Sequence, residues 1–268
     1  MRIDACFIAC AGLGTRMGEI SASIPKPLMP IFNQSILETL VKQVKALGIK
    51  KIIINTHHLS EVLEDFVERE NIDCTVINED KLLGSGGCFY NVKKNFPELE
   101  NVLSLNGDLV LDVNKKLIED CLREYIESGV DIGLMSARVG SSFEGNRLLV
   151  EGNFLKGLSA QKTSEVTFSG MAIVNLSKLD KSYNNTISSF FESVSNFNNK
   201  KVFIFNTVIK SWEDFGTRDR YLESHDRIYK DKSHFIREFI KKINGRTFSF
   251  DINEKRVLVS PDEITLSS

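Results

Sequence analysis

The chain has 268 residues, with 34 lysine and arginine residues against 36 aspartate and glutamate residues and a formal net charge of -2. Hydrophobic residues make up 42% and charged residues 26%, a balance typical of a globular protein, and it excludes a largely disordered chain. Because the opposite charges nearly cancel, composition argues against binding to nucleic acid or to an anionic membrane and favours a local site for a small phosphorylated ligand.

The thiols and the apolar segments indicate where the protein resides. The five cysteines, which include no Cys-x-x-Cys pair, are Cys6, Cys10, Cys74, Cys88 and Cys121. An odd, scattered set is typical of reduced cytosolic thiols. No stretch approaches the roughly 20 apolar residues of a membrane span. Asp4 interrupts the first apolar run, so we expect no signal peptide and predict a cytoplasmic protein.

Strands and helices are predicted to alternate in the first part of the chain, up to about residue 112. Residues 3–9 form an apolar run that ends in a glycine loop, as a buried strand does before a tight turn. Apolar residues recur at helical spacing from Ile36 to Leu47, and Gly48 ends that helix. The other elements expected here are strands at 51–55, 73–77 and 101–105 and helices at 59–67 and 86–96. This order implies right-handed crossovers and a mainly parallel sheet, with ligands beyond the carboxyl ends of its strands.

The pattern changes beyond residue 113, where shorter strands indicate a mixed sheet. A helix at 115–128 and a strand at 131–137 precede strands near 147–150, 154–158, 166–174 and 201–206, and a helix follows at 217–230. A helical stripe at 187–197 is rich in phenylalanine, and we interpret it as core packing. Residues 233–268 are expected to add a helix and a hairpin of unknown role. The whole pattern predicts an α/β fold, a three-layer α/β/α arrangement of Rossmann-like type with a mixed, mainly parallel sheet.

The loop after the first strand is suited to phosphate binding. Residues 9–16 (ACAGLGTR) offer consecutive backbone N–H groups, with no side-chain obstruction at Gly12 and Gly14. A dinucleotide-binding loop is excluded because Met17 stands where a third glycine is needed and the second strand ends without an acid. A Walker P-loop is excluded because no Gly-Lys-Ser/Thr follows at the required spacing.

A lysine between two prolines follows this loop. In Pro25-Lys26-Pro27 the prolines fix φ on both sides, and they are expected to push Lys26 toward extended geometry. Lys26 follows Arg16 by ten residues in the sequence. Two cations at this spacing make sense if both bind one polyphosphate.

These motifs resemble the signature of the sugar-1-phosphate nucleotidyltransferases, also called nucleoside-diphosphate-sugar pyrophosphorylases. The signature consists of residues 12–16 (GLGTR) and 25–28 (PKPL), and the resemblance continues at 83–87 (LGSGG), 105–108 (LNGD), 168–170 (FSG) and 212–217 (WEDFGT). The chain is most similar to N-acetylmuramate-1-phosphate uridylyltransferases and to mannose- and heptose-phosphate guanylyltransferases. The resemblance implies a fold of the nucleotide-diphospho-sugar transferase type. It implies a nucleotidyltransferase domain at 1–232, with a nucleotide-binding half at about 1–112 and a sugar-phosphate-binding half at about 113–232, and an extension at 233–268.

The resemblance implies transfer of a nucleotidyl group from a nucleoside triphosphate to a sugar 1-phosphate, with release of pyrophosphate, for cell-surface glycan precursors. UTP is favoured as the donor, with GTP and CTP as alternatives. The attacking phosphate is already an anion at neutral pH, so the reaction needs no general base. Catalysis then depends on positioning and on charge neutralisation by arginine, lysine and Mg²⁺.

The resemblance also assigns roles to single residues. Arg16 would bind the departing pyrophosphate and Lys26 the attacked α-phosphate, while Asp108 and Asp214 would bind Mg²⁺; Arg16, Lys26 and Asp108 are the predicted catalytic residues. Nucleotide contacts are expected at Ala11, Gly12, Gly14, Thr15, Arg16, Lys26, Gly84, Gly86, Gly87 and Asn106. Acceptor contacts are expected at Gly145, Asn146, Lys162 and Gly170. Gln161 replaces a glutamate of many members, which leaves the identity of the sugar open.

Other interpretations stay open from the sequence alone. Asn106-Gly107-Asp108 is also common turn chemistry, and Asp214 could cap the helix that follows it. A phosphocholine-type cytidylyltransferase would need aromatic faces around a quaternary ammonium. A non-catalytic nucleotide-binding regulatory subunit is the alternative of another class. The expected partners are a nucleoside triphosphate and a sugar 1-phosphate, without nucleic acid or membrane, and a homo-oligomer remains one option.

Overall fold

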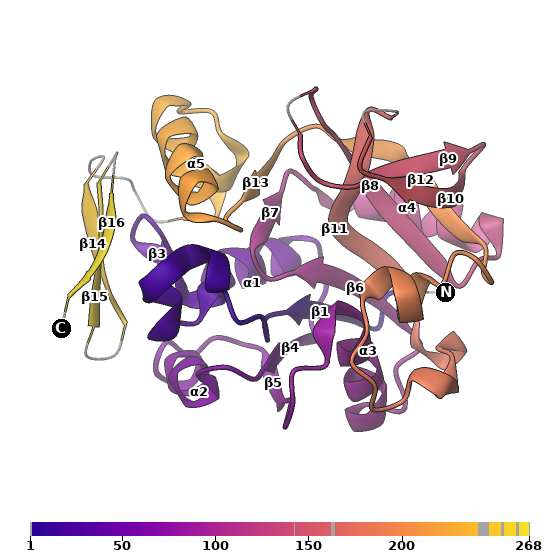
Figure 1. Ribbon diagram of the computed structural model, residues 1–268, viewed down its shortest axis with the longest axis horizontal. Helices are drawn as coiled ribbons and strands as arrows, with labels where there is room; N and C mark the ends of the chain where they lie inside the picture. The colour runs from indigo at the N-terminus through magenta and orange to yellow at the C-terminus, as the bar shows by residue number, and fades with distance from the viewer. Residues whose placement is uncertain are drawn as a thin grey trace.

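A central sheet of nine strands organises the structure, which is a computed structural model (Figure 1). The structure describes residues 2–141, 143–161, 164–240, 247–252, 255–260 and 263–267. The strand order in the sheet is β5-β4-β1-β6-β11-β8-β12-β10-β9, and helices cover both of its faces. None of the helices in the described part of the chain is long and apolar enough to cross a membrane.

The first part of the chain, up to about residue 112, contains four parallel strands in this sheet. They are β1 (Ala5–Ala9), β4 (Ile52–Thr56), β5 (Thr75–Asn78) and β6 (Asn101–Asn106). Side chains of β1 alternate between two cores, with Cys6 and Ile8 in one and Ala5 and Phe7 in the other. This alternation is what a sheet covered on both faces requires. It confirms the predicted α/β/α layers.

Helices on the two faces complete these layers. One core includes side chains of α1 (Ile36–Ala46), α2 (Ser60–Arg69), α4 (Lys115–Ser128) and α5 (Arg218–Lys230). The other core includes side chains of α3 (Gly84–Asn95). The predicted helices at 36–47 and 115–128 are confirmed almost to the residue.

Helix α1 begins where local sequence dictates. The hydroxyl of Ser35 accepts a hydrogen bond from the backbone N–H of Glu38, and the Glu38 carboxylate accepts one from the backbone N–H of Ser35. This capping box satisfies N–H groups that the first helical turn leaves unpaired. After the helix, Gly48 has a φ of 87°, a left-handed conformation that glycine adopts without strain.

The second half extends the same sheet. It contributes β8 (Ile132–Arg138), β9 (Arg147–Glu151), β10 (Phe154–Ser159), β11 (Val166–Asn175) and β12 (Val202–Ile209). Strand β11 runs antiparallel to both β6 and β8, and β12 runs parallel to β8. Strands β8 and β12 therefore point the same way as β1 and β6, so their carboxyl ends share one edge. The prediction of a mixed, mainly parallel sheet is confirmed.

The phenylalanine stripe at 187–197 packs into the core, as interpreted from the sequence. Its helical part is the short π-helix η5 (Phe190–Ser195), in which Phe190 and Val194 are buried. The Phe190 ring stacks on Phe168 of β11 at a centroid distance of 5.2 Å. Ile187 is the exception, because 67% of it is exposed.

Several short elements were not predicted from the sequence. They are the 3-10 helix η1 (Thr15–Ala22), the 3-10 helices η3 (Leu176–Lys178) and η4 (Lys181–Tyr183), the strand pair β2 (Pro30–Ile31) and β3 (Gln34–Ser35), and the strand pair β7 (Leu109–Leu111) and β13 (Trp212–Asp214). Strands of two or three residues are too short for a periodic pattern to develop, so only tertiary pairing defines them.

The C-terminal residues pack against Phe32 and His225. They form η6 (Phe235–Glu238) and the antiparallel sheet β14 (Phe248–Ile252), β15 (Lys255–Val259) and β16 (Ile264–Ser267), at one end of the molecule in Figure 1. The Phe248 ring lies 5.1 Å from Phe32 and 5.2 Å from His225 between centroids. The expected helix and hairpin therefore appear as a 3-10 helix and a three-stranded sheet that shares the main core.

His225 at this junction makes folding stability depend on pH. Its Nδ1 contacts the backbone oxygen of Tyr221 at 2.8 Å and its Nε2 accepts from the N–H of Phe32 at 3.4 Å, which assigns the neutral ring. Burial lowers the pKa of His225 to about 4. The unfolded chain therefore binds the proton more strongly, and stability is lost as pH falls below about 6.5. We expect the unfolding free energy to drop by about 2 kcal/mol between pH 7 and pH 5 through this group.

The measurement is urea unfolding at both pH values for the native chain and for His225→Gln. The variant should start from lower stability and lose about 2 kcal/mol less on acidification. An identical loss in both proteins would contradict the assigned role of His225.

Candidate active site

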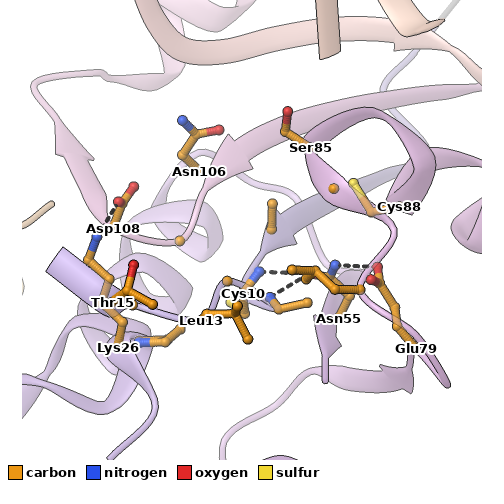
Figure 2. A pocket seen from close by; sticks show the side chains of 18 of the residues that line it. Cys10, Leu13, Thr15, Lys26, Asn55, Glu79, Ser85, Cys88, Asn106 and Asp108 are labelled. Atoms are coloured by element: carbon orange, nitrogen blue, oxygen red, sulfur yellow. Dashed lines mark hydrogen bonds and ion pairs between the residues drawn. The ribbon is translucent and has the colours of Figure 1, made fainter. Parts of the chain in front are cut away.

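A cavity of about 400 Å³ lies at the carboxyl ends of β1, β4 and β6 (Figure 2). It brings together residues that are far apart in the sequence. The predicted site residues among those that line it are Ala11, Gly12, Gly14, Thr15, Arg16, Lys26, Gly84, Asn106 and Asp108. A cavity at this edge of a mainly parallel sheet is the expected position for a ligand.

The glycine loop turns into a helix at the cavity wall. Gly14 has a φ of 65° and stands immediately before η1, whose first residues Thr15 and Arg16 line the cavity. A Cβ atom at position 14 would lie 3.1 Å from the Cβ of Ser21, so both conformation and space favour glycine. The first backbone N–H groups of η1 lie at this wall, where they suit an anion.

Two buried polar residues that the sequence analysis missed support this loop. Asn55 follows the apolar part of β4, and its Oδ1 accepts from the N–H groups of Cys10 at 2.6 Å and Ala11 at 3.3 Å. Its Nδ2 donates to Glu79 at 2.7 Å, and the other Glu79 oxygen accepts from the N–H of Leu83 at 2.9 Å. This chain of hydrogen bonds, the Asn55 link, joins β4 to the loops that follow β1 and β5. Figure 2 shows the part around Asn55 and Glu79 at one side of the cavity.

Burial makes this link costly to disturb. Asn55 is 2% exposed and Glu79 is 3% exposed. Burial raises the pKa of the Glu79 carboxyl, an effect partly opposed by its hydrogen bonds from Leu83 and Asn55. The available signal in the sequence was that each polar residue stands at the carboxyl end of a predicted parallel strand.

Lys26 lies at the other side of the cavity, where Figure 2 shows its side chain meeting Asp108. It is 9% exposed, and its Nζ donates to Asp108 Oδ2 at 2.7 Å and to the backbone oxygen of Gly216 at 3.1 Å. The expectation of an extended Lys26 is wrong, because Lys26 begins the short 3-10 helix η2 (Lys26–Leu28). The extended conformation falls on Pro25, whose φ is -55° and ψ is 135°. Proline at the second position of η2 is tolerated because its missing N–H has no helical partner there.

Asp108 and Asp214 are brought together by the pairing of β7 with β13. Asp214 lies opposite Leu109 in this pair, and the N–H of Phe215 donates to the backbone oxygen of Asp108 at 2.9 Å. Asp214 accepts from the N–H of Gly216 at 2.6 Å and from Arg220 at 2.5 Å. It lines a neighbouring cavity and is not among the described residues that line the cavity of the glycine loop. The interpretation of Asp214 as a helix cap is wrong, because Thr217 caps α5.

The carboxylate oxygens of Asp108 and Asp214 are ligands of the kind that Mg²⁺ prefers. Among the described residues, no cluster of three or more histidine, cysteine, aspartate or glutamate side chains is placed to hold a metal. Mg²⁺, however, is commonly bound by one or two carboxylates together with substrate phosphates and water. The side chains of Asp108 and Asp214 remain 26% and 19% exposed, so an ion can reach their oxygens.

Gly86 and Gly87 are not among the described residues that line the cavity. A Cβ atom on Gly86 would lie 2.3 Å from the backbone oxygen of Ser189, and one on Gly87 would lie 2.5 Å from that of Thr186. The N–H of Gly86 also donates to the oxygen of Ser188 at 2.9 Å. The structure therefore gives these glycines a packing reason, while their predicted nucleotide contacts stay predictions.

Of the described residues predicted to contact the acceptor, only Gly170 is shown beside a residue that lines this cavity. Gly170, with a φ of 81°, approaches Asn106 at the cavity so closely that a Cβ atom would lie 3.0 Å from Asn106 Nδ2. Gly145 and Asn146 lie in the loop between β8 and β9 and are not among the described residues that line the cavity of the glycine loop. Lys162 lies outside the described residues.

Comparison with known proteins agrees with this geometry. The family model described as MobA-like NTP transferase domain matches residues 6–161, which is more than half of the chain. The chain therefore belongs to this family of nucleotidyltransferases, and the predicted resemblance to sugar-1-phosphate nucleotidyltransferases is confirmed.

Two curated relatives and one solved structure illustrate the similarity. The chain is 34% identical over 111 residues to D-glycero-alpha-D-manno-heptose 1-phosphate guanylyltransferase of Campylobacter jejuni, covering 40% of this chain and 49% of that protein. It is 24% identical over 254 residues to the bifunctional protein GlmU of Methanococcus maripaludis, covering 90% of this chain and 56% of that protein. The chain thus spans about half the length of these relatives.

The crystal structure of HddC from Yersinia pseudotuberculosis complexed with GMP-PN superposes with a TM-score of 0.68 at 20% identity. The superposition covers 84% of this chain and 100% of that chain. It confirms the fold of the nucleotide-diphospho-sugar transferase type.

The Asn55 link gives a stability prediction. Asn55→Ala leaves two buried N–H groups and one oxygen of Glu79 without their partner, so we expect a loss of about 2 to 3 kcal/mol in unfolding free energy. Asn91→Ala is the matched control, because Asn91 is partly exposed and its side chain donates to the backbone oxygen of Asn78 and accepts from Asn95, both at exposed sites. Chemical denaturation of both variants is the measurement, and equal losses would show that the link does not stabilise the loop.

Proposed function

We propose that the chain transfers a nucleotidyl group from a nucleoside triphosphate to a sugar 1-phosphate, releasing pyrophosphate, with Mg²⁺ as cofactor. The observation that carries this proposal is the nearly buried Lys26 ammonium, held at 2.7 Å from Asp108 in the same cavity as the glycine loop and Arg16. Fixed cations in a partly water-excluded cavity are what a reaction between two anions needs.

The reaction requires an oxygen of the sugar phosphate to form a bond to the α-phosphorus of the triphosphate. The bond from that phosphorus to the bridging oxygen breaks, and pyrophosphate leaves with the negative charge. Lys26 is positioned to neutralise charge at the α-phosphate, and Arg16 at the leaving pyrophosphate. Asp108 and Asp214 would hold Mg²⁺, which would supply further positive charge at the phosphate oxygens.

Other residues of the cavity position the donor. Backbone N–H groups of the loop at 11–15 suit the triphosphate, and the Asn55 link holds that loop in place. Gly84 and Asn106 line the remaining wall of the cavity and are available for the ribose and base. Glu79 has both oxygens engaged within the protein, so we assign it a supporting role.

We propose GTP as the first donor to test. The sequence favoured UTP, but the guanylyltransferase name of the Campylobacter relative and the GMP-PN complex of the Yersinia protein support a guanine nucleotide. The name of the same relative supports a sugar 1-phosphate acceptor. Use of the product as a precursor of cell-surface glycans is proposed from the resemblance of the motifs alone.

The alternatives gain no support from the site. A phosphocholine-type acceptor would need open aromatic faces, whereas the rings of Phe168, Phe190 and Phe191 pack against one another at centroid distances of 5.2 to 5.7 Å. A regulatory subunit without catalysis would not need a buried lysine held at the carboxyl end of β6.

The proposal is tested by incubating the protein with Mg²⁺ and each of the four common nucleoside triphosphates against a panel of sugar 1-phosphates, while pyrophosphate release is measured. Release with at least one pair supports the proposal, and GTP is expected to give the highest kcat/KM. Absence of release in every combination would contradict it.

Lys26→Gln should lower kcat/KM at least 100-fold, because it removes the cation nearest the proposed α-phosphate position. Asp108→Ala should abolish release. The matched control is Lys45→Gln, which removes an exposed lysine paired with Asp73 and should retain activity. Circular dichroism establishes that each variant is folded, and full activity of a folded Lys26→Gln would overturn the assignment.

Metal removal tests the role given to the two carboxylates. Dialysis against a chelator should abolish pyrophosphate release, and added Mg²⁺ should restore it. Asp214→Asn should raise the Mg²⁺ concentration that gives half-maximal rate about tenfold or more, because one charged oxygen ligand is lost. A rate that is unchanged by the chelator would refute the metal assignment.

A further inference from the structure

A second cavity, of about 750 Å³, lies beside the acceptor loops and is rich in cations. Among the described residues, its lining includes the cations Arg138, Arg147 and Lys210 and one acid, Glu165. It shares Arg138, Val139 and Gly140 with the cavity that Asp214 lines. The cation-rich cavity is therefore continuous with the surface beside the proposed metal ligands.

The sheet places these cations at the same edge as the glycine loop. Arg138 is the last residue of β8, and Lys210 follows β12. These strands run parallel, with Ile209 opposite Ala137. Because β1 and β6 point the same way, the carboxyl ends of all four strands meet at one edge, where ligands of such sheets bind.

Arg147 forms the buried floor of this cavity. It is 2% exposed, and its guanidinium donates to the backbone oxygens of Ser164 at 2.6 Å, Gly140 at 2.7 Å and Phe143 at 3.5 Å. The guanidinium carbon also lies 5.7 Å from the centroid of the Phe143 ring. Its Nε is buried and has no hydrogen-bond partner, and no carboxylate among the described residues pairs with this side chain. A buried charge without a counter-ion is unfavourable. Carbonyl dipoles offset only part of this cost, so an incoming anion would be stabilised here.

The other charges leave this positive excess in place. Arg138 approaches Glu165 only to 3.8 Å, and their side chains are 71% and 84% exposed, so solvent weakens the pair. Lys210 forms no ion pair with any residue in the described part of the chain. Three cations thus face one loosely held acid.

The position of Arg147 connects the cavity to the acceptor. Its hydrogen bonds to Gly140 and Ser164 join the loop between β8 and β9 to the loop between β10 and β11. The first of these loops carries Gly145 and Asn146, which are predicted to contact the sugar. The nucleotide cavity, by contrast, shares none of its described lining residues with the cation-rich cavity.

We propose that Arg138, Arg147 and Lys210 form a subsite for a second anionic group on the acceptor. The acceptor is then an acidic sugar 1-phosphate, which carries a carboxylate or a further phosphate besides the reacting one. This inference rests on the proposed function, because it names the acceptor class of the same reaction.

Matched acceptors test the subsite. One pair is a hexose 1-phosphate and the corresponding hexuronate 1-phosphate, and another is the hexose 1-phosphate and the hexose 1,6-bisphosphate. We expect kcat/KM to favour the more acidic member of at least one pair tenfold or more. Arg138→Met and Lys210→Met should each reduce that ratio about tenfold. Lys50→Met removes an exposed lysine just before β4, at the opposite edge of the sheet, and should leave the ratio unchanged.

The ratio separates the subsite from general damage, because an effect on folding alters both acceptors alike. Arg147 is left intact, since replacing a buried side chain also changes stability. A ratio near one in the native chain, or a preference that both variants retain, would overturn the proposal. Inorganic phosphate could instead raise the rate with the neutral acceptor in a manner that depends on Lys210, while the native chain shows no preference for the acidic acceptor. That result would indicate a site for a free anion and would also overturn the proposal.

Failure of the proposed function is distinguishable from failure of the subsite. If no acceptor is turned over, the subsite is tested by binding instead. Calorimetry measures the affinity of the native chain and of Lys210→Met for hexuronate 1-phosphate and for hexose 1-phosphate. Tighter binding of the acidic sugar to the native chain, lost in the variant, supports the subsite. Equal binding of both sugars overturns it.

Discussion

The ion pair between Lys26 and Asp108, 2.7 Å long, is the constraint on which the geometry of the candidate site depends. It joins the segment after the glycine loop to the carboxyl end of β6, across 82 residues of sequence. A lysine that is 9% exposed keeps its charge at low cost only where an anion lies close. Asp108 supplies that anion, and the backbone oxygen of Gly216 adds a second acceptor. The cation is thus fixed at the cavity wall by the protein itself.

The opposite wall of the cavity depends on hydrogen bonds made by the amide group of Asn55 and the carboxyl group of Glu79. Asn55 and Glu79 hold the glycine loop and the start of α3 in register, so the two walls of the cavity are both set by contacts between loops. The second half of the sheet continues the same edge toward Arg138, Arg147 and Lys210. Positive charge along one sheet edge is consistent with a reaction in which both substrates are anions.

Local signals in the sequence were sufficient for the long elements. Helix α1 has a capping box and a terminal glycine, and α4 has Asn114 as its N-cap and Gly129 at its end, so their bounds could be predicted closely. The link through Asn55 could not be predicted, because a polar residue after a strand has many uses until its neighbours are known. The prediction of an extended Lys26 was wrong, because Pro25 adopts the extended conformation and Lys26 begins the 3-10 helix η2. Gly86 is explained by close contacts with Ser189 and Ser193, about a hundred residues away.

A crystal structure with Mg²⁺ and a non-hydrolysable GTP analogue tests the central claim most directly. The account predicts a triphosphate lying along residues 11–16, with Lys26 Nζ within hydrogen-bonding distance of the α-phosphate and the metal ion on Asp108. A triphosphate bound elsewhere, or a Lys26 side chain turned away from it, would contradict the account.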